Sequence, residues 1–466
     1  MKKILLFLTI LFATISTYSQ ILIDDGPIII NRKIGMTPDY VIQGNSWNHR
    51  ILTYWFSNGT NDITGNEERI AIRSAMDIWQ TQTNLRFFEV CDSVDADIIF
   101  MWTTGDHGDG YPFDGTGGTL AHAFFPPPNG DYAGDVHFDD DETWTTATRP
   151  NSDQPIDLIT IAAHELGHSL GLAHSSVSSA LMYAYYSGSH RYLHQDDING
   201  IRSIYGNPGT YDFISGPTLF CSSDSFTLND LPPVDSIIWI PGPYLSISSG
   251  QNTSSCTFTR SPVNSGSSWV SARLVNDCGS ITLPQKEVYV GGGTVEYIMG
   301  PLQASTITAN RYLIMTSSLS EPTSFDWFVT PSNSSVIYSY GSSADIEFNN
   351  PGDYLLTVWA NNTCGSGSPY QQIITAYDSL LLRISPNPTT GETTLTIQSS
   401  SEKEILDVNR EWDLEVYTQT QVLKAKKNRL KGSSTVINTS GWQEGVYVVR
   451  ALYNNEIITG KLFVKR

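Results

Sequence analysis

The chain has 466 residues, of which 40% are hydrophobic and 11% aromatic, and its formal net charge is −20. This length exceeds what one ordinary core accommodates, so we expect several domains, and the composition is typical of globular rather than disordered chains. The strong negative charge argues against nucleic acid or an anionic membrane surface as a partner.

The N-terminal segment MKKILLFLTILFATISTYSQ has the composition of a secretory signal peptide. Two lysines precede an apolar run that is short for a membrane span, and the small residues Thr17 and Ser19 follow it. We therefore expect a signal peptide at 1–19 and export of the mature chain. The alternative is a membrane anchor, but no stop-transfer run follows. Since no later segment is apolar enough to cross a bilayer, we expect no transmembrane anchor in the mature protein.

Residues 47–206 show a mixed pattern of strands and helices. The alternating segment RILTYWF predicts a strand from Arg50, and the periodic segment EERIAIRSAMDIWQTQT predicts a helix from Glu67. Two segments, ADIIFMW and GGTLAHAFF, predict further strands, and a helix is expected from Pro155 through Leu170. The segment QDDINGIRSIYG predicts a short closing helix that ends at Gly206. This order of elements predicts an α+β domain.

After Gly206 the composition changes to Ser, Thr, Gly and Pro with short alternating strands, which is typical of all-β structure. A weak internal repeat follows, because ARLVNDCGSITLPQKEVYV resembles VWANNTCGSGSPYQQIITA. Each copy is preceded by a strand that carries Trp239 or Trp327. We therefore expect two β-sandwich modules of immunoglobulin-like size, at 207–292 and 293–378.

The five cysteines are widely spaced, at Cys91, Cys221, Cys256, Cys278 and Cys364. This spacing excludes a scaffold built mainly from disulfides, and the lack of a Cys-x-x-Cys pair argues against a thiolate zinc site or a thiol redox centre. Cys221 could pair with Cys278 across the first sandwich, which would leave Cys256 unpaired. The second sandwich holds only Cys364, so it has no internal bridge.

The segment AAHELGHSLGLAHSS carries three histidines and one glutamate at close spacing. On a helix, His164 and His168 lie one turn apart on the same face, so their imidazoles can bind one zinc ion. Glu165 lies beside the first histidine and can reach a metal-bound water without binding the metal. Gly171 allows a sharp turn, after which His174 supplies a third nitrogen. Three protein ligands leave one coordination position for water, which indicates a catalytic zinc.

The complete segment resembles the metzincin signature His-Glu-x-x-His-x-x-Gly-x-x-His. Ser175, after the third histidine, is the matrixin choice among metzincins, and Met182 in ALMYAYY resembles the Met-turn methionine beneath the zinc. The resemblance to matrixins covers 47–206 and implies a zinc endopeptidase with a metzincin catalytic domain at 40–206. Matrixins usually carry Pro-x-Tyr after Met-Tyr; here Ala184 replaces the proline and Tyr186 keeps the tyrosine, so the pocket wall is less rigid.

The resemblance also implies metal sites upstream of this motif. The structural zinc of the family is matched by His107, Asp109, His122 and His137, nitrogen and oxygen ligands that suit a tetrahedral site. The adjacent calcium site is matched by the carboxylates of Asp114, Asp139 and Glu142 with the carbonyls of Gly115, Gly117 and Thr119. A second calcium site, near Asp97 and Asp135, is a weaker match. The alternative is a solvated acidic loop without bound cations.

Substrate-binding residues follow from the same resemblance. The edge strand around Leu120–Ala121 is expected to pair with an extended protein or peptide substrate, which adds main-chain hydrogen bonds without sequence demands. Thr160, four positions before His164, and Tyr186 are expected to shape the main specificity pocket.

The segment at 20–39 resembles the short pro-segment of bacterial matrixins, with trimming expected before Tyr40. Animal matrixins block their zinc with a pro-segment cysteine, but no cysteine precedes Cys91 here. In the bacterial relatives an aspartate occupies the open metal position, and DDGP makes Asp24 the candidate latency switch with Asp25 as runner-up. The alternative is an exposed acidic pair at a disordered end.

The C-terminal segment at 379–466 resembles the type IX secretion sorting domain of Bacteroidetes. The residues that carry this resemblance are Pro386–Pro388, the GVY at Gly445–Tyr447 and the basic terminal strand. It implies a small β-rich domain and delivery to the cell surface or the medium by the type IX secretion machinery.

Together these features predict a secreted zinc endopeptidase that cleaves extracellular proteins, with Glu165 as general base on a zinc-bound water. One alternative is an inactive metalloprotease-like surface adhesin, which would lack Glu165 or a metal ligand. Another is a different metzincin subclass such as a serralysin, which would carry Gly-Gly-x-Gly-x-Asp repeats that this chain does not have.

Overall fold

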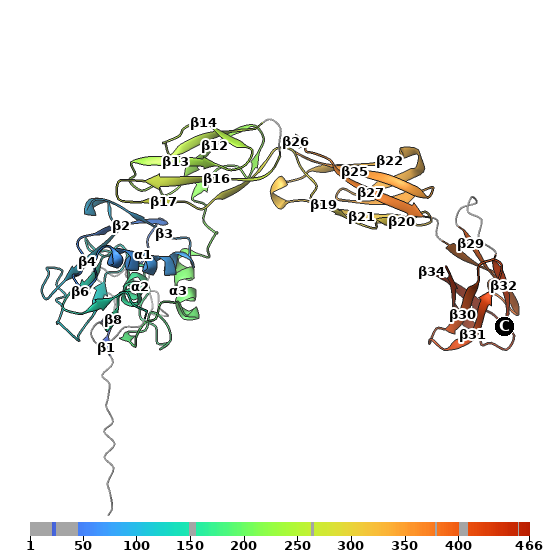
Figure 1. Cartoon of the computed structure of the whole chain (residues 1–466), viewed down its shortest axis with the longest axis horizontal. Helices are drawn as coiled ribbons and strands as arrows, with labels where there is room; N and C mark the ends of the chain where they lie inside the picture. Colours follow the sequence, from blue (N-terminus) through green and yellow to red (C-terminus); the bar gives the residue numbers. More distant parts are fainter. Residues whose placement is uncertain are drawn as a thin grey trace, which may run out of the picture. The chain divides into compact units, whose positions relative to one another are not determined.

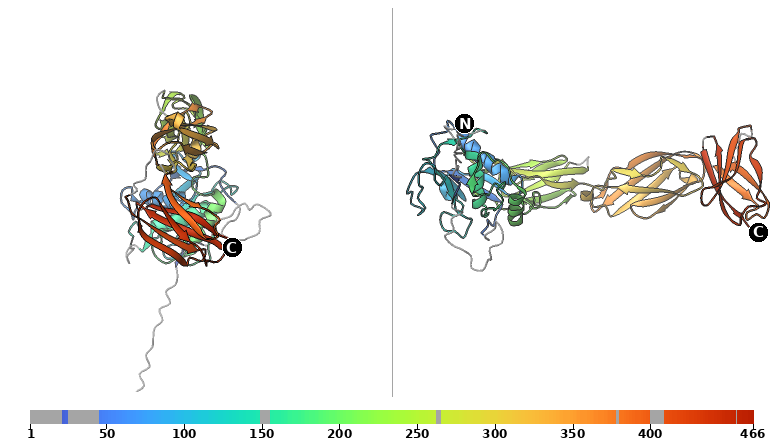
Figure 2. Two further views of the ribbon diagram at one scale, coloured as in Figure 1. Left: turned by 90° about the vertical axis from the view of Figure 1, so that its right-hand side faces the viewer. Right: turned by 90° about the horizontal axis from the view of Figure 1, so that it is seen from below.

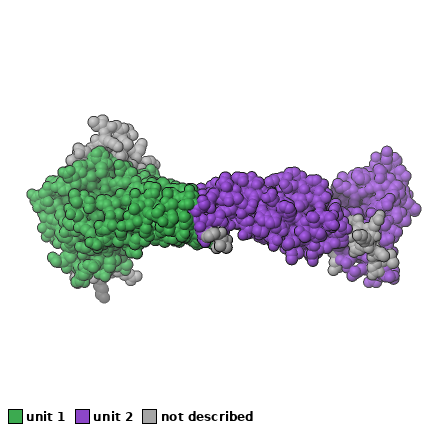
Figure 3. All heavy atoms as spheres, turned by 90° about the horizontal axis from the view of Figure 1, so that it is seen from above, with its two compact units in different colours: residues 1–217, 223–259, 269–287 green, residues 218–222, 260–268, 288–466 purple. Residues whose placement is uncertain are grey.

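The structure, a computed structural model, describes residues 21–24, 45–148, 155–261, 265–377, 380–399, 409–454 and 456–466. The predicted signal peptide, Asp25 and the junction before Tyr40 lie outside the described residues. The chain divides into two compact units, namely unit 1 with Met1–Pro217, Ser223–Thr259 and Trp269–Glu287, and unit 2 with Thr218–Ser222, Arg260–Ser268 and Val288–Arg466 (Figure 3). The predicted domain boundaries stay predictions.

A five-stranded sheet with the order β3-β2-β4-β6-β5 forms the centre of the first domain. Its strands are β2 (Ile51–Phe56), β3 (Arg86–Glu89), β4 (Ile98–Thr103), β5 (Ala121–Ala123) and β6 (Val136–Asp139). The pairs β3–β2, β2–β4 and β4–β6 are parallel, and β5 pairs with β6 antiparallel. Strand β5 therefore lies at the sheet edge, where one side of its backbone is open to another extended chain.

Three helices accompany this sheet: α1 (Glu67–Gln80), α2 (Leu158–Ser169) and α3 (Gln195–Tyr205). Helices α1 and α2 lie side by side (Figure 1), and the Trp79 indole of α1 donates a hydrogen bond to the Ala163 carbonyl of α2 at 2.8 Å. The apolar face of α1 predicted from Ile72, Met76 and Trp79 is buried. Helix α2 also contacts β5 and β6, and α1 contacts β3, so both helices pack against the sheet, which confirms the α+β fold.

Two details differ from the sequence expectation. The second helix begins at Leu158 rather than at Pro155, because Ile156–Asp157 forms strand β8, which pairs with β7 (Trp144–Thr145). Strands β3 and β6 were not predicted, since each is only four residues long. Both differences reflect pairing with distant segments, which local periodicity does not contain.

Each of the two sandwiches has two sheets with equivalent strand order, which confirms the predicted all-β modules. The first has β10-β12-β15-β14 and β11-β18-β16-β13 with β17 beside β16, and the second has β19-β21-β24-β23 and β20-β27-β25-β22 with β26 beside β25. One pair in each is parallel, β11 with β18 and β20 with β27. The two layers of the second sandwich are seen edge-on in the right-hand view of Figure 2.

The strands of the first sandwich are β10 (Ile214–Ser215), β11 (Leu219–Phe220), β12 (Ser223–Leu228), β13 (Ser236–Pro241), β14 (Leu245–Ser249), β15 (Ser255–Arg260), β16 (Gly266–Val275), β17 (Ser280–Thr282) and β18 (Lys286–Val290). Those of the second are β19 (Tyr297–Met299), β20 (Gln303–Ser305), β21 (Asn310–Met315), β22 (Ser324–Thr330), β23 (Ser335–Ser339), β24 (Ser343–Phe348), β25 (Gly352–Asn362), β26 (Gly365–Ser366) and β27 (Tyr370–Tyr377). Trp239 and Trp327 occupy equivalent strands, β13 and β22, and both are buried. The internal repeat in the sequence is therefore a repeat of structure.

The C-terminal domain consists of the sheets β28-β29-β32 and β31-β30-β33-β34. Its strands are β28 (Leu380–Ser385), β29 (Glu392–Ser399), β30 (Trp412–Thr418), β31 (Leu423–Leu430), β32 (Ser434–Asn438), β33 (Gly445–Tyr453) and β34 (Glu456–Val464). Trp412, Leu414 and Val449 are among the residues of its own hydrophobic core. Across the described part of the chain, no helix is long and apolar enough to cross a membrane.

The disulfide pairing corrects the sequence expectation. Cys91 is bonded to Cys278 and Cys221 to Cys364, so the predicted Cys221–Cys278 pair is wrong, whereas Cys256 is free and buried. Cys278 lies in the connection between β16 and β17, and Cys364 lies at the equivalent place between β25 and β26. Cys278 and Cys364 are each bonded to a cysteine of the preceding domain instead of one in their own sandwich. Cysteine spacing does not indicate which pairing forms.

Replacing both Cys91 and Cys278 by serine is expected to lower the free energy of unfolding of unit 1 by about 2–4 kcal/mol. The bond joins residues 187 positions apart, so its loss raises the conformational entropy of the unfolded chain and thereby favours unfolding. Urea unfolding monitored by tryptophan fluorescence measures the change. The matched control is Cys221→Ser with Cys364→Ser, which should leave unit 1 unaffected, and an unchanged unit 1 midpoint in the first variant would contradict the expectation.

Candidate metal centres and active site

Helix α2 presents His164 and His168 toward one point. The His164 ring donates from Nδ1 to the Leu181 carbonyl at 2.7 Å, and the His168 ring donates from Nδ1 to the Leu172 carbonyl at 2.6 Å. A carbonyl can only accept, so both rings carry their proton on Nδ1 and leave the Nε2 lone pair free. The two Nε2 atoms are 3.2 Å apart, and neither has a proton to share with the other. This arrangement is typical of metal-ligating histidines.

The chain turns sharply after α2 to bring in the third histidine. Gly171 has φ +99°, and a Cβ there would lie 2.5 Å from the Asn45 carbonyl oxygen, so only glycine fits. His174 then places its Nε2 beside those of His164 and His168, and one ligand atom of each lies within 4.8 Å of the others. The structure thus brings together the three predicted ligands.

Asp24 completes this cluster. Its carboxylate oxygens lie 2.5 Å from the Nε2 of His174 and 3.2 Å from that of His168. The side chain is fully buried, yet among the described residues neither of its oxygens nor the His174 Nε2 takes part in a contact with hydrogen-bond geometry. Lone pairs that converge on one point without sharing a proton match the donor set of a zinc ion, with three nitrogens and one carboxylate. The residues therefore fit the metal that the sequence implies.

The two carboxyl groups of this site, Asp24 and Glu165, have pKa values shifted in opposite directions. Burial raises the pKa of Asp24, but the neighbouring histidines, His168 first among them, lower it by more, and the pKa ends well below its usual range. Burial raises the pKa of Glu165, and the negative charge of Asp24 raises it further, well above the usual range. Both Glu165 carboxylate oxygens are buried and have no hydrogen-bond partner among the described residues. Glu165 is thus a free proton acceptor or donor beside the cluster.

Met182 packs against α2 at Gly167, next to His168 in the sequence. A Cβ on Gly167 would come within 2.2 Å of the Met182 sulfur, so the glycine allows the methionine to pack against the helix. Asp197 holds the methionine turn, because its carboxylate accepts hydrogen bonds from the backbone amides of Leu181 at 2.9 Å and Met182 at 3.2 Å. The sequence analysis did not identify Asp197. It lies in the first turn of α3, where an acidic residue is also explained by helix capping alone.

The segment that leads to Asp24 lies between two walls of a cleft. Strand β1 (Ile21–Leu22) pairs antiparallel with β9 (Tyr185–Tyr186), and the Ile23 amide donates to the Ala184 carbonyl at 2.8 Å. On the other wall, the amides of Leu120 and Ala121 donate to the Ile23 carbonyl at 3.0 and 3.3 Å. The predicted substrate-pairing edge is therefore engaged by the N-terminal segment at 21–24 in this structure.

A pocket opens beside this cleft and is lined by Ile23, Thr160, Ser178, Ala180, Leu181, Tyr183, Tyr185, Tyr186, Ser187, Gly188 and His190. The two predicted pocket residues, Thr160 and Tyr186, are both among them. The Tyr186 hydroxyl donates to the Pro155 carbonyl at 3.1 Å and accepts from the Asp157 amide at 2.9 Å. These bonds hold the tyrosine wall in place although Ala184 stands where a proline is usual.

The second histidine cluster gathers around Asp109. One Asp109 oxygen lies 2.8 Å from the His107 Nε2 and 2.9 Å from ring nitrogens of His122 and His137. Burial lowers the pKa of His122, and burial with the charge of His122 lowers the pKa of His137 to about 4. Neutral imidazoles beside a carboxylate are the state in which these groups bind a cation. The four predicted ligands of the structural zinc are therefore brought together.

The predicted calcium ligands lie in the neighbouring loop. The Thr119 amide donates to Asp114 at 2.9 Å, and the Gly117 amide donates to Glu142 at 2.5 Å. Burial raises the pKa of Glu142, and the charges of Asp139 and Asp114 raise it further. One Asp139 oxygen is buried without a hydrogen-bond partner among the described residues. Crowded carboxylates of this kind are relieved by a divalent cation, and Gly115 and Gly117 adopt positive φ angles that bend the loop around them.

The two carboxylates of the weaker second calcium site have separate hydrogen bonds. One Asp97 oxygen accepts from the Thr53 amide at 2.8 Å and lies 3.0 Å from the His49 Nε2. Asp135 accepts from the Ile99 amide at 3.0 Å, and burial raises the pKa of this carboxyl to about 8. The described residues do not gather these two groups as they do the histidine clusters, so this site stays a prediction.

In metal-free protein, the stability of unit 1 is expected to fall as pH rises from about 4 to about 8 because of Asp135. The unfolded carboxyl ionises near pH 4, whereas the folded one ionises near about 8. The stability contributed by the protonated form is therefore complete below pH ~4 and is lost as pH rises through the folded pKa. Asp135→Asn keeps an acceptor for Ile99 and should flatten this dependence in urea unfolding with chelator at pH 5 and pH 8.

Calcium provides the control for this prediction. If Asp135 is a ligand, calcium restores the stability of the wild type at pH 8 but not that of the asparagine variant. Equal pH dependence of both proteins in chelator would contradict the assignment of the shifted carboxyl to Asp135.

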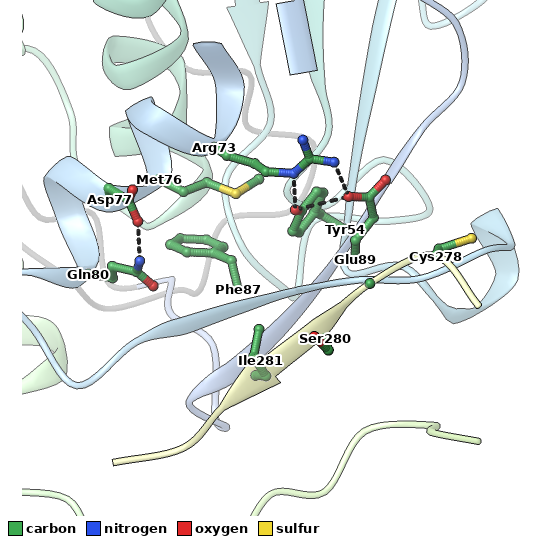
Figure 4. A pocket seen from close by; sticks show the side chains of 11 residues that line it. Tyr54, Arg73, Met76, Asp77, Gln80, Phe87, Glu89, Cys278, Ser280 and Ile281 are labelled. Carbon is green, nitrogen blue, oxygen red and sulfur yellow. Dashed lines mark hydrogen bonds and ion pairs between the residues drawn. The ribbon is translucent and has the colours of Figure 1, made fainter. Parts of the chain in front are cut away.

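A different cavity of about 370 Å³ lies between α1, β3 and β17, apart from the histidine clusters. Figure 4 shows the Arg73 guanidinium between the Tyr54 hydroxyl and the Glu89 carboxylate, with hydrogen bonds of 3.3 and 2.6 Å. The Asn276 side-chain amide donates to the Glu89 backbone carbonyl at 2.8 Å, and the Cys91–Cys278 bond lies nearby. These contacts connect the first domain to the β16–β17 hairpin within unit 1.

Comparisons with known proteins agree with this chemistry. The family described as Matrixin matches residues 46–206, and the family described as Secretion system C-terminal sorting domain matches residues 383–465. The protein is 32% identical over 496 residues to Karilysin of Tannerella forsythia, covering 100% of both chains. It is 45% identical over 188 residues to matrix metalloproteinase-16 of Homo sapiens, which is 38% of this chain and 30% of that protein. The Hatching enzyme of Paracentrotus lividus is 46% identical over 171 residues, which is 36% of this chain and 28% of that protein.

An α+β domain with three histidines converging from one helix and the turn after it defines a zinc metallopeptidase of the metzincin type. The chain belongs to the matrixin family: it is a bacterial matrixin with a type IX secretion sorting domain, and its activity is that of a zinc metalloendopeptidase. The sorting domain makes it a secreted or cell-surface protein. Its similarity to Karilysin extends through the sandwiches and the tail, whereas its similarity to the two animal enzymes is confined to a part of each chain.

Proposed function

We propose that this metallopeptidase cleaves extracellular proteins with Glu165 as its general base. The observation that carries the proposal is the position of an unpartnered, buried Glu165 carboxylate on the same helix as His164 and His168. Zinc held by His164, His168 and His174 would supply Lewis acidity to the attacking water and to the substrate carbonyl. Glu165 takes the proton from the water and then delivers it to the leaving amine.

The substrate main chain is expected to occupy the cleft that the pro-segment fills in the zymogen. The amides of Leu120 and Ala121, which bind the Ile23 carbonyl, are donors suited to an extended peptide. Such hydrogen bonds go to the backbone and therefore fix the orientation of the scissile bond without selecting its sequence.

Selection is proposed to come from the pocket around Thr160 and Tyr186, with a preference for medium or large aliphatic residues after the scissile bond. Ile23 lines this pocket, so a branched aliphatic side chain already packs against its walls. The small Thr160 side chain, four positions before His164, leaves room for the entering residue.

In the zymogen, Asp24 is proposed to take the coordination position that water needs. The support is the convergence of its carboxylate with the three histidines and the low pKa of that carboxyl. The four residues around Asp109 are proposed to hold a structural zinc. The Asp114, Asp139 and Glu142 loop is proposed to hold calcium, which would stabilise the loops that border the cleft.

Cleavage of a randomised peptide library by the mature enzyme tests the proposal. We expect products that begin with aliphatic residues, loss of cleavage with a zinc chelator, and recovery when zinc is returned. A strong preference for charged residues after the scissile bond would refute the pocket assignment, and chelator-resistant cleavage would refute the metal-dependent mechanism.

A further inference from the structure

The specificity pocket is small although the side chain of Thr160 leaves room in it. With Ile23 as one of its walls, the pocket keeps about 20 Å³ of open space, which is room for about one water molecule. A larger groove of about 440 Å³ is lined by α1, by α3 and by the segment between β9 and α3, with Ile78, Arg191 and Ile198 among its residues. None of the described residues lines both spaces, so a wall separates the pocket from the groove.

An ion pair forms this wall. Arg191, which lines the groove, donates from Nε and Nη2 to the two oxygens of the Asp157 carboxylate at 2.8 and 2.6 Å. Thr160, which lines the pocket, donates from its hydroxyl to the same carboxylate at 2.7 Å. The Asp157 carboxylate is fully buried. It therefore lies between a residue of the pocket and a residue of the groove.

Further hydrogen bonds hold the guanidinium in place. The Arg191 Nη2 also donates to the backbone carbonyls of Thr146 and Ala147 at 2.9 and 3.0 Å. The backbone amide of the residue before Arg191 donates to the Thr160 hydroxyl at 2.7 Å, which fixes this segment to α2. An apolar side chain that displaced the guanidinium would leave the buried Asp157 charge unpaired, which is costly. The wall therefore resists an entering side chain.

We propose that the Asp157–Arg191 ion pair determines specificity by closing the inner end of the pocket. The enzyme then accepts aliphatic side chains up to about the length of methionine after the scissile bond and rejects longer ones, although Thr160 alone would leave the pocket deep. Without the Arg191 side chain, the pocket would open into the groove beside α1. This inference deepens the proposed function of the pocket and rests on it.

Two peptides that differ only in the length of a straight alkyl side chain after the scissile bond, norleucine or 2-aminodecanoic acid, test the proposal. The measured quantity is the ratio of kcat/KM for the long peptide to that for the norleucine peptide. We expect Arg191→Ala to raise this ratio about tenfold or more relative to the wild type, because the long chain can enter the groove. A merely structural loss would lower both values alike and leave the ratio unchanged. Arg191→Lys, which keeps a cation for Asp157, is the matched control and should keep the preference for norleucine.

A second variant is needed because Arg191→Ala leaves a buried charge unpaired, which destabilises the site. Asp157→Asn combined with Arg191→Ala removes both charges and should show the same rise in the ratio. An unchanged ratio in either active variant overturns the proposal, and so does a wild type that cleaves both peptides equally well. A double variant that cleaves neither peptide also overturns it, because a wall can be removed without loss of the metal centre. A wild type that cleaves neither peptide nor any member of the library refutes the proposed function itself.

Discussion

Glu165→Ala is expected to lower kcat/KM for peptide cleavage by about 10³-fold or more, while the protein keeps its fold and its metal content. The carboxylate is buried next to the histidine cluster, but it is not part of that cluster. Its removal therefore leaves the metal ligands intact and removes the group that moves the proton. The measurement is single-substrate kinetics on a fluorogenic peptide, with metal analysis of the same sample.

The matched control is Glu165→Gln, which retains the size and hydrogen-bonding shape of the side chain but cannot take up a proton. It should be as inactive as the alanine variant. Substantial turnover by either variant with its full metal content would show that another group is the base.

Asp24→Ala is expected to turn a latent zymogen into an active one when the cleavage junction before Tyr40 is made uncleavable. Without the carboxylate, the fourth position of the centre is open to water, whereas β1 and Ile23 still cover the cleft. We therefore expect peptidase activity at least about tenfold above that of the uncut wild type, measured on a small peptide that can compete for the cleft.

Asp25→Ala is the control for this experiment, because it removes the same charge one position further along the chain. It should preserve latency. Equal latency of the wild type and both variants would eliminate the carboxylate switch and would leave coverage of the cleft as the explanation. N-terminal sequencing of the mature wild type tests the predicted junction independently.

The first histidine cluster was predictable because its chemistry leaves a local pattern, whereas the second cluster and the calcium loop followed from the resemblance to matrixins. His164, Glu165 and His168 lie on one helical turn, and Gly171 marks the turn that returns His174 to them. The fold class followed from the change of composition after Gly206 and from the paired tryptophan strands. In each case the relevant residues are close in sequence or recur at a fixed interval.

The features that could not be predicted depend on contacts between distant segments. The Cys91–Cys278 bond joins residues 187 positions apart, and α2 starts at Leu158 because Ile156–Asp157 pairs with the separate strand Trp144–Thr145. Asp197 supports the methionine turn from the first turn of α3, a place where an acidic residue also has a purely local explanation.

The central claim is that a zinc ion lies between His164, His168 and His174, with Asp24 as its fourth ligand in the zymogen. Anomalous diffraction at the zinc edge from crystals of the uncut protein tests it most directly. The account predicts one peak within bonding distance of those four side chains, about 2.0–2.2 Å from each ligand atom, and a second peak among His107, Asp109, His122 and His137. A zymogen with a peak at the second cluster and none at the first would contradict it.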